Sequence, residues 1–417
     1  MTDILRQSQR SQQLVTRRES RWKLVNDKRV DISSAHEWDE ITLDEFSGLV
    51  AELKSWRKNK QLLRRLKAGL AMGDDFISAF YANQNAMEAL TNVVSSNDPC
   101  RQLEAIACVT NLSCGNHKAT FRAVRAVAPY LITFLNGYNP FLQDQCTWAL
   151  GNMASDCDQC CTWLTAQGIC YALVKTLETP HNQLLESCLF ALQAYTRSPS
   201  ADVECLVHLG VVRKFRDLLR KETSPWFISQ FARVTFNIFS REDCSVADHE
   251  EAASLCRVLA ERLVACARLS EQDVSTLTPL VRCLAIFAAH QDSLASTVAQ
   301  SPDMAECLAV LLNSTYLHLR RECLWLLNNL AAALVWNEMN FNLTVSSLDG
   351  ILPLICCESS HIETVLSFLG NIASKIPVFR ESLVESSNLL DQVKSLASSG
   401  GKESTVAQNL LTLLGTM

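Results

Sequence analysis

Three side chains of complementary chemistry share one face of the helix predicted for residues 146 to 156, whose sequence is CTWALGNMASD. Trp148, Asn152 and Asp156 follow one another at intervals of four residues, so a helix aligns them along one side. An indole packs against a lysine side chain, an amide hydrogen-bonds to a peptide backbone, and a carboxylate pairs with an ammonium group. The spacing therefore predicts a surface that binds an extended, lysine-rich peptide.

The segment is one copy of an internal repeat. Alignment on the asparagine at 152 finds related sequences separated by 41, 42, 43, 50, 42 and 42 residues. The aligned positions are Asn111, Asn152, Ala194, Asn237, Phe287, Asn329 and Asn371. A period of about 40 to 47 residues is typical of armadillo and HEAT arrays, in which two or three helices form each unit. The long interval indicates an inserted loop, which we place in REDCSVADHEE.

Within each period the pattern is helical. Between Asn111 and Asn152, apolar residues recur at three- and four-residue spacing, with helix breaks predicted near Pro129, Gly137 and Pro140. Apolar and polar residues do not alternate with period two over any sustained stretch, so no strand is predicted. The sequence predicts an all-α, right-handed armadillo-repeat solenoid (a superhelix) of about seven to eight repeats at 41–417. A basic, partly flexible extension is predicted at 1–40.

Charge and hydropathy narrow the class of protein. A hydrophobic content of 48%, with 13 Gly and 10 Pro in 417 residues, is typical of a helical array and excludes a disordered or collagen-like chain. Residues 1–30 carry a formal charge of +5, which leaves −11 for the rest of a chain whose net charge is −6. An acidic body favours basic protein segments over nucleic acid as partners.

The 18 cysteines indicate a reducing compartment rather than a disulfide framework. Five of them fall at core positions of predicted helices, and these are Cys108, Cys146, Cys188, Cys283 and Cys323. Residues 1–30 lack the apolar run of a signal peptide, and the most apolar stretch, CLWLLNNLAAALVW, is too short to span a membrane. Cytoplasmic and nuclear localisation is therefore expected.

Motifs for catalysis or metal binding are not apparent. Cys157, Cys160 and Cys161 form a lone CxxCC without a second pair at zinc-finger spacing, so no metal site is predicted. The chain has no phosphate loop, no nucleophile elbow, no HExxH and no dinucleotide fingerprint. We expect neither an enzyme nor a bound cofactor.

The repeats resemble those of importin-α, the adaptor family that carries nuclear localisation signals. RQLEAIACVTNLSCGN is similar to the third helix of that family's second repeat, and LQDQCTWALGNMASD to that of its third. In the family, Trp and Asn of successive third helices form a ladder on the concave surface, where asparagines hold the cargo backbone and lysines lie between tryptophans. By this resemblance, the N-terminal major site would contain Asn111, Gln145, Trp148, Asn152 and Asp156, the last receiving the key lysine.

The resemblance also implies a C-terminal minor site and an incomplete ladder. Trp325 and Asn329 match one Trp-Asn pair there, with Glu322 as its acid. Other members of the ladder are replaced, as the residues Ala107, Phe190, Ala194, Cys283 and Phe287 show. A cation–π contact or a hydrogen bond contributes about 0.5 to 2 kcal/mol, so losing several weakens binding by orders of magnitude.

The predicted function is an importin-α-like adaptor that binds basic cargo segments, the nuclear localisation signals, in a concave groove for nuclear protein import. The segment QQLVTRRESRWKLVNDKR resembles the basic arm through which importin-α binds importin-β, although it lacks a dense arginine cluster. The alternative is a non-transport armadillo scaffold with a degenerate groove, which keeps Trp148 by descent. A membrane-associated protein would need an anchor that the sequence does not show.

Overall fold

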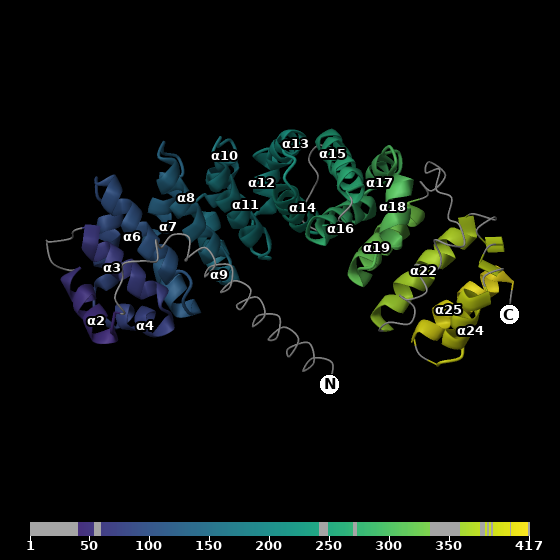
Figure 1. Cartoon of the computed structure of the whole chain (residues 1–417), viewed down its shortest axis with the longest axis horizontal. Coiled ribbons are helices and arrows are strands. Elements are labelled where there is room, and N and C mark those ends of the chain that lie inside the picture. The colour runs from purple at the N-terminus through teal and green to yellow at the C-terminus, as the bar shows by residue number, and fades with distance from the viewer. Residues whose placement is uncertain are drawn as a thin grey trace. The chain divides into compact units, whose positions relative to one another are not determined.

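The computed structural model describes residues 41–53, 60–241, 249–269, 273–333, 359–375, 380–381, 383–384, 387–400 and 402–415 (Figure 1). The predicted basic extension at 1–40 and most of the inserted loop lie outside these residues. All regular elements in the described ranges are helices, which confirms the all-α class. The chain forms two compact units that divide between Asp202 and Val203.

The first unit contains two layers of helices. Its helices are α2 (Leu43–Glu52), α3 (Lys60–Ala71), α4 (Asp74–Ala82), α5 (Ala86–Val94), α6 (Pro99–Leu112), α7 (His117–Phe134), α8 (Pro140–Ala154), α9 (Asp158–Ala166), α10 (Ile169–Thr176) and α11 (Asn182–Thr196). Helices α3, α6, α8 and α11 pack against one another in chain order and form one layer. Helix α7 contacts α5 on one side and α9 on the other, in the second layer.

The second unit repeats this arrangement. Its helices are α12 (Val203–His208), α13 (Val211–Lys221), α14 (Pro225–Phe239), α15 (His249–Ala267), α16 (Val274–His290), α17 (Asp292–Ala299), α18 (Met304–Leu312), α19 (Leu317–Ala332), α22 (Ser359–Lys375), α24 (Ser387–Ala397) and α25 (Lys402–Leu414). Helices α14, α16, α19 and α22 pack in chain order, and α13, α15 and α17 form the other layer.

The repeat alignment locates the recurring helix of each period. The seven aligned positions lie near the C-terminal ends of α6, α8, α11, α14, α16, α19 and α22. Complete units, such as α9–α10–α11 and α17–α18–α19, contain three helices, and the aligned helix is the third. The period therefore predicted both the helical class and the register of these third helices.

Local sequence sets where the third helices begin. Asp98 precedes Pro99 at the start of α6, and Asn139 precedes Pro140 at the start of α8. Each capping side chain accepts hydrogen bonds from two backbone N–H groups of the first turn. Proline at the first helical position loses no hydrogen bond, because that N–H has no partner within a helix. These starts fix which residues reach the far end of each helix.

The break predicted at Pro129 is wrong, because α7 continues through it to Phe134. A proline inside a helix loses one hydrogen bond and crowds the preceding turn. Apolar residues on both sides of Pro129, among them Val127 and Leu131, are fully buried, so core packing keeps the helix continuous. The chain turns only after Leu135, close to the predicted break at Gly137.

The core contains the five thiols that the sequence placed there. Cys108, Cys146, Cys188, Cys283 and Cys323 are fully buried and carry no disulfide. Burial raises the pKa of Cys108 to about 12, because the thiolate would lose its hydration. These side chains therefore act as small apolar core residues.

Candidate peptide-binding surface

The indole of Trp148 is covered rather than presented to solvent. Its residue is only 5% exposed, and Phe190 of α11 stacks on it with ring centroids 4.4 Å apart and planes inclined by 21°. Gly151 permits this approach, because a Cβ there would lie 2.5 Å from the Phe190 ring. A lysine side chain between two rings needs about 7 Å, two van der Waals contacts of 3.5 to 4.0 Å. The expectation of an exposed Trp148 is therefore not met in this conformation.

The predicted asparagines link neighbouring third helices. The Nδ2 atom of Asn111 donates to the Lys67 carbonyl at 2.9 Å, and Asn329 donates to the Ala285 carbonyl at 2.8 Å. Asn152 is wholly buried, and its Nδ2 lies 3.4 Å from the Thr110 carbonyl oxygen. In each case the acceptor belongs to the third helix of the preceding repeat. The amide N–H groups therefore hold the repeats together.

Two amide oxygens on α8 remain without a hydrogen-bond donor. Oδ1 of Asn152 and Oε1 of Gln145 are buried and have no partner among the described residues. Buried acceptors of this kind usually find a protein or water donor, so each is a candidate for pairing with a ligand N–H. Access to them requires movement of the side chains that cover them.

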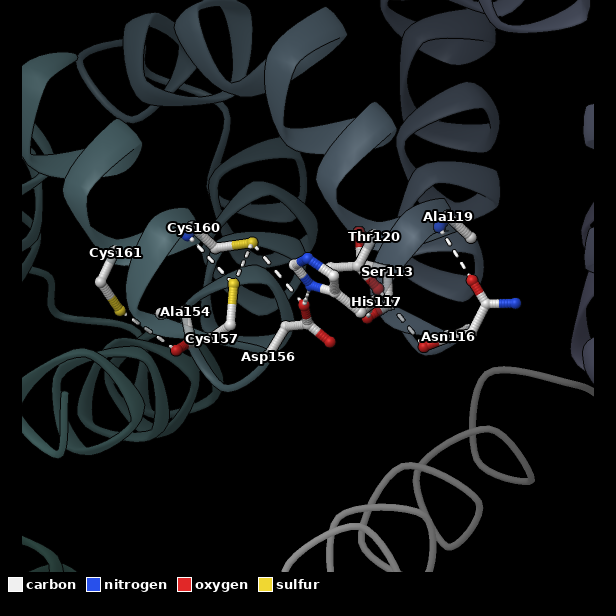
Figure 2. Close-up of polar contacts among 11 residues, drawn as sticks. Ser113, Asn116, His117, Ala119, Thr120, Ala154, Asp156, Cys157, Cys160 and Cys161 are labelled. Carbon is white, nitrogen blue, oxygen red and sulfur yellow. Dashed lines mark hydrogen bonds and ion pairs between the residues drawn. The ribbon is translucent and has the colours of Figure 1, made fainter. Parts of the chain in front are cut away.

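The acid predicted to receive a lysine already contacts a basic side chain. The side chain of Asp156 is 4% exposed, and its Oδ2 lies 2.6 Å from Nδ1 of His117 (Figure 2). His117 is the first residue of α7 and comes 39 residues earlier, about one repeat. No role for His117 followed from the sequence. Only its offset by about one period from Asp156 could have indicated the contact.

The acid of the predicted minor site is paired in the same way. Arg282 of α16 hydrogen-bonds to Glu322 of α19, and its guanidinium carbon lies 5.9 Å from the centroid of the Phe236 ring. The hydrogen bond to Glu322 raises the pKa of Arg282. Trp325, one turn after Glu322, is half-buried. Arg282 thus already pairs with the acid that the resemblance to importin-α assigned to a peptide base.

A third acid, which sequence reasoning missed, follows the same pattern. Glu104 on α6 is buried and accepts from Arg64 at 2.8 Å and from Lys67 at 3.1 Å, both on α3. Burial opposes ionisation of Glu104, but its hydrogen bonds to the two bases and their charges outweigh it and lower its pKa. Three acids associated with third helices are therefore paired with bases one repeat earlier.

Comparison with known proteins finds similarity to an importin α subunit and to engineered proteins. No protein-family model matches the chain. Importin subunit alpha-9 of Arabidopsis thaliana is 24% identical over 386 residues, which cover 85% of this chain and 72% of the plant protein. Two engineered proteins with solved crystal structures are each 21% identical in sequence to this chain. The match to the first has a TM-score of 0.64 and covers 90% of this chain and 99% of the engineered chain. The match to the second has a TM-score of 0.52 and covers 60% of this chain and 99% of the engineered chain.

The three-helix repeats, their period and these similarities define an all-α armadillo-repeat protein. In sequence the chain is importin-α-like. Within the described residues, no helix is long and apolar enough to cross a membrane.

Proposed function

We propose that the protein is an importin-α-like adaptor that binds basic segments of cargo proteins for nuclear import, and that it works in the cytoplasm and the nucleus. The observation that carries the proposal is the similarity to importin subunit alpha-9 over 85% of the chain. In addition, Trp148, Asn152 and Asp156 are all present in the segment CTWALGNMASD. Importin-β is the partner expected for such an adaptor.

Binding at the major site would require an exchange of contacts. A lysine side chain that packs on Trp148 must displace Phe190, and its ammonium must replace His117 at Asp156. An aromatic stack contributes about 0.5 to 1.5 kcal/mol beyond its area, which is close to what a cation–π contact returns. A lysine ammonium is charged at pH 7 and can form a charge-assisted hydrogen bond with the Asp156 carboxylate. We expect weak binding that depends on salt.

Fluorescence anisotropy with a labelled lysine-rich signal peptide tests the major site. Wild-type protein should bind, and Trp148→Ala or Asp156→Asn should weaken binding about tenfold or more, since each ~1.4 kcal/mol is a factor of ten. Asp158→Asn is the matched control, because Asp158 is an exposed acid two residues away that accepts from Ser198. Absence of binding by the wild type, or equal effects of all three substitutions, would contradict the proposal.

A second candidate function is a non-transport armadillo scaffold. The observation that favours it is that the indole of Trp148 and the acids Asp156 and Glu322 are all engaged within the chain. Pull-down of the full chain with importin-β separates the two functions. Capture that is lost when residues 1–40 are deleted supports the adaptor. Failure of the full chain to bind either importin-β or a basic peptide favours the scaffold.

A further inference from the structure

Four side chains with metal-binding atoms meet at the junction of two repeats (Figure 2). They are His117 at the start of α7, Asp156 and Cys157 between α8 and α9, and Cys160 in the first turn of α9. One donor atom from each lies within 4.8 Å of the corresponding atoms of the other three. The set combines one imidazole nitrogen, one carboxylate oxygen and two sulfurs.

We propose that these four residues bind a zinc ion in tetrahedral coordination. Zinc binds sulfur at about 2.3 Å and nitrogen or oxygen at about 2.0 to 2.2 Å, so neighbouring donors of a tetrahedral site lie about 3.3 to 3.8 Å apart. The sulfurs of Cys157 and Cys160 are 3.5 Å apart, and the Cys160 sulfur is 3.8 Å from Oδ2 of Asp156. To admit the ion, the 2.6 Å contact between His117 and Asp156 has to open by about 0.7 Å, and donors that lie as far as 4.8 Å apart have to approach by about 1 Å.

The donor set selects zinc among the common divalent ions. Thiolates and imidazole are ligands of zinc, whereas magnesium and calcium prefer oxygen alone. Four protein ligands fill the tetrahedron and leave no position for a substrate, so the ion would be structural. It would fasten the first turn of α7 to the α8–α9 junction, which belong to successive repeats. Because Asp156 is a ligand here, zinc and a peptide lysine would compete for its carboxylate.

The surrounding structure holds each ligand in place. Asn116 caps α7 by accepting from the Ala119 N–H at 3.0 Å, and Phe121 stacks on the His117 ring with centroids 6.0 Å apart. Cys157 caps α9, and its sulfur accepts from the Cys160 N–H at 3.4 Å. Such supporting contacts orient the ligands of known metal sites.

The exposed side of the cluster gives an ion access, and the neighbouring Cys161 is not a ligand. The His117 side chain is 48% exposed, while Asp156 and Cys160 are buried, so an ion can enter from the imidazole side. Cys161 is adjacent in sequence, but its sulfur points to the Ala154 carbonyl at 3.2 Å (Figure 2). It is therefore a natural control. Spacing within CxxCC could not reveal the site, because two of the four ligands lie outside that motif.

In the metal-free protein, burial and the contact with Cys157 raise the pKa of Cys160, so this thiol keeps its proton. Zinc would replace the thiol protons of Cys157 and Cys160 and bind both sulfurs as thiolates, releasing the protons to solvent. No electron transfer is involved. The competing reaction is oxidation of the two thiols to a disulfide, in which an oxidant takes up two electrons and two protons are released. Neither sulfur could then bind zinc as a thiolate.

The experiment uses the full chain purified under reducing conditions. Elemental analysis should find about one zinc per chain. After removal of zinc, titration with Co²⁺ should give the intense visible bands of a tetrahedral site together with thiolate-to-cobalt charge transfer. Cys157→Ser or Cys160→Ser should reduce the charge transfer, and His117→Gln or Asp156→Asn should weaken zinc binding at least tenfold. Cys161→Ser should behave as wild type.

Thermal unfolding supplies a second measurement that does not depend on each variant folding equally well. Added zinc should raise the Tm of wild type and of Cys161→Ser, and should leave the Tm of His117→Gln nearly unchanged. Because His117 is half-exposed, its substitution spares the core. The proposal is overturned by substoichiometric zinc, by a cobalt spectrum that survives Cys160→Ser, or by a Cys157–Cys160 disulfide in the reduced preparation.

Discussion

At the scale of single residues, the predicted surface is occupied by the chain's own side chains. Phe190 takes the place beside Trp148, and Arg282 takes the place at Glu322, where a bound peptide would put its lysines. Each replacement comes from an adjacent third helix. Substitutions that remove these side chains should therefore expose the sites without altering the residues that recognise the peptide.

Phe190→Ala should strengthen binding of a lysine-rich peptide about tenfold, because a ligand would no longer lose an aromatic stack of about 0.5 to 1.5 kcal/mol before reaching Trp148. Fluorescence anisotropy measures the affinity, and increased acrylamide quenching of Trp148 checks the exposure. Phe141→Ala serves as the control, since Phe141 is an aromatic residue of α8 that is 70% exposed. Equal or weaker affinity of Phe190→Ala would show that Trp148 takes no part in binding.

Arg282→Gln should free Glu322 and increase binding of the same peptide to the second unit, in a manner that high salt reverses. The cost in stability should be below about 1 kcal/mol, because Arg282 is half-exposed and solvent screens the pair. Arg282→Lys keeps a cation beside Glu322 and should leave binding as in the wild type. Peptide binding by the two Arg282 variants is best compared in a Trp148→Ala background, where the major site is inactive. If Arg282→Gln and Arg282→Lys bind equally, the predicted minor site does not operate.

At the scale of helices, the asparagines of the ladder stabilise the stacking of repeats. Asn111, Asn152 and Asn329 each donate to a backbone carbonyl of the preceding third helix. Asn111 links α6 to α3, and Asn329 links α19 to α16. This contact explains why an asparagine can recur at the period of the repeat even where its neighbouring tryptophan is absent.

Asn329→Ala should lower the free energy of unfolding by about 1 kcal/mol, because it removes a partly buried hydrogen bond between the third helices α19 and α16. Urea denaturation measures the change. Asn313→Ala provides the comparison, since the exposed Asn313 donates only to the Ala309 carbonyl of its own helix. We expect less than about 0.5 kcal/mol there. Equal losses for both substitutions would mean that the link between repeats contributes nothing.

At the scale of the whole molecule, the buried thiols make stability depend on alkaline pH. The pKa of Cys108, Cys256 and Cys307 is raised by burial to about 12 in the folded protein, against an ordinary value of 9.0. Above pH 9 the unfolded chain therefore releases protons that the folded chain retains. Stability is fully present below pH 9 and falls as the pH rises from 9 towards 12.

Each such thiol should contribute a slope of about −1.4 kcal/mol per pH unit in this range. The Cys108→Ala variant should lose one such slope, although it is less stable at neutral pH. Urea unfolding of both proteins at pH 8, 9, 10 and 10.5 measures it. Cys100→Ala is the control, because Cys100 is exposed. Parallel pH profiles for wild type and Cys108→Ala would contradict the role of burial.

Several features of the molecule follow from the sequence alone. The spacing of about 42 residues predicted the helical repeats and placed Asn152 and its equivalents near the ends of the third helices. The apolar periodicity predicted the burial of five cysteines, which are Cys108, Cys146, Cys188, Cys283 and Cys323. These features were accessible because helix period, capping and burial depend on residues that lie within a few turns of one another.

Only the tertiary structure decided what the aligned side chains contact. Phe190 on Trp148, His117 on Asp156 and Arg282 on Glu322 each join residues about one repeat apart, and stacking of the helices brings them together. The four-ligand cluster arises in the same way, from a CxxC motif and residues that no single stretch of sequence contains with it. Core packing likewise carried α7 through Pro129. The sequence determined the repeat, because periodicity is local. Packing between repeats determined whether the aligned side chains face solvent or the chain itself.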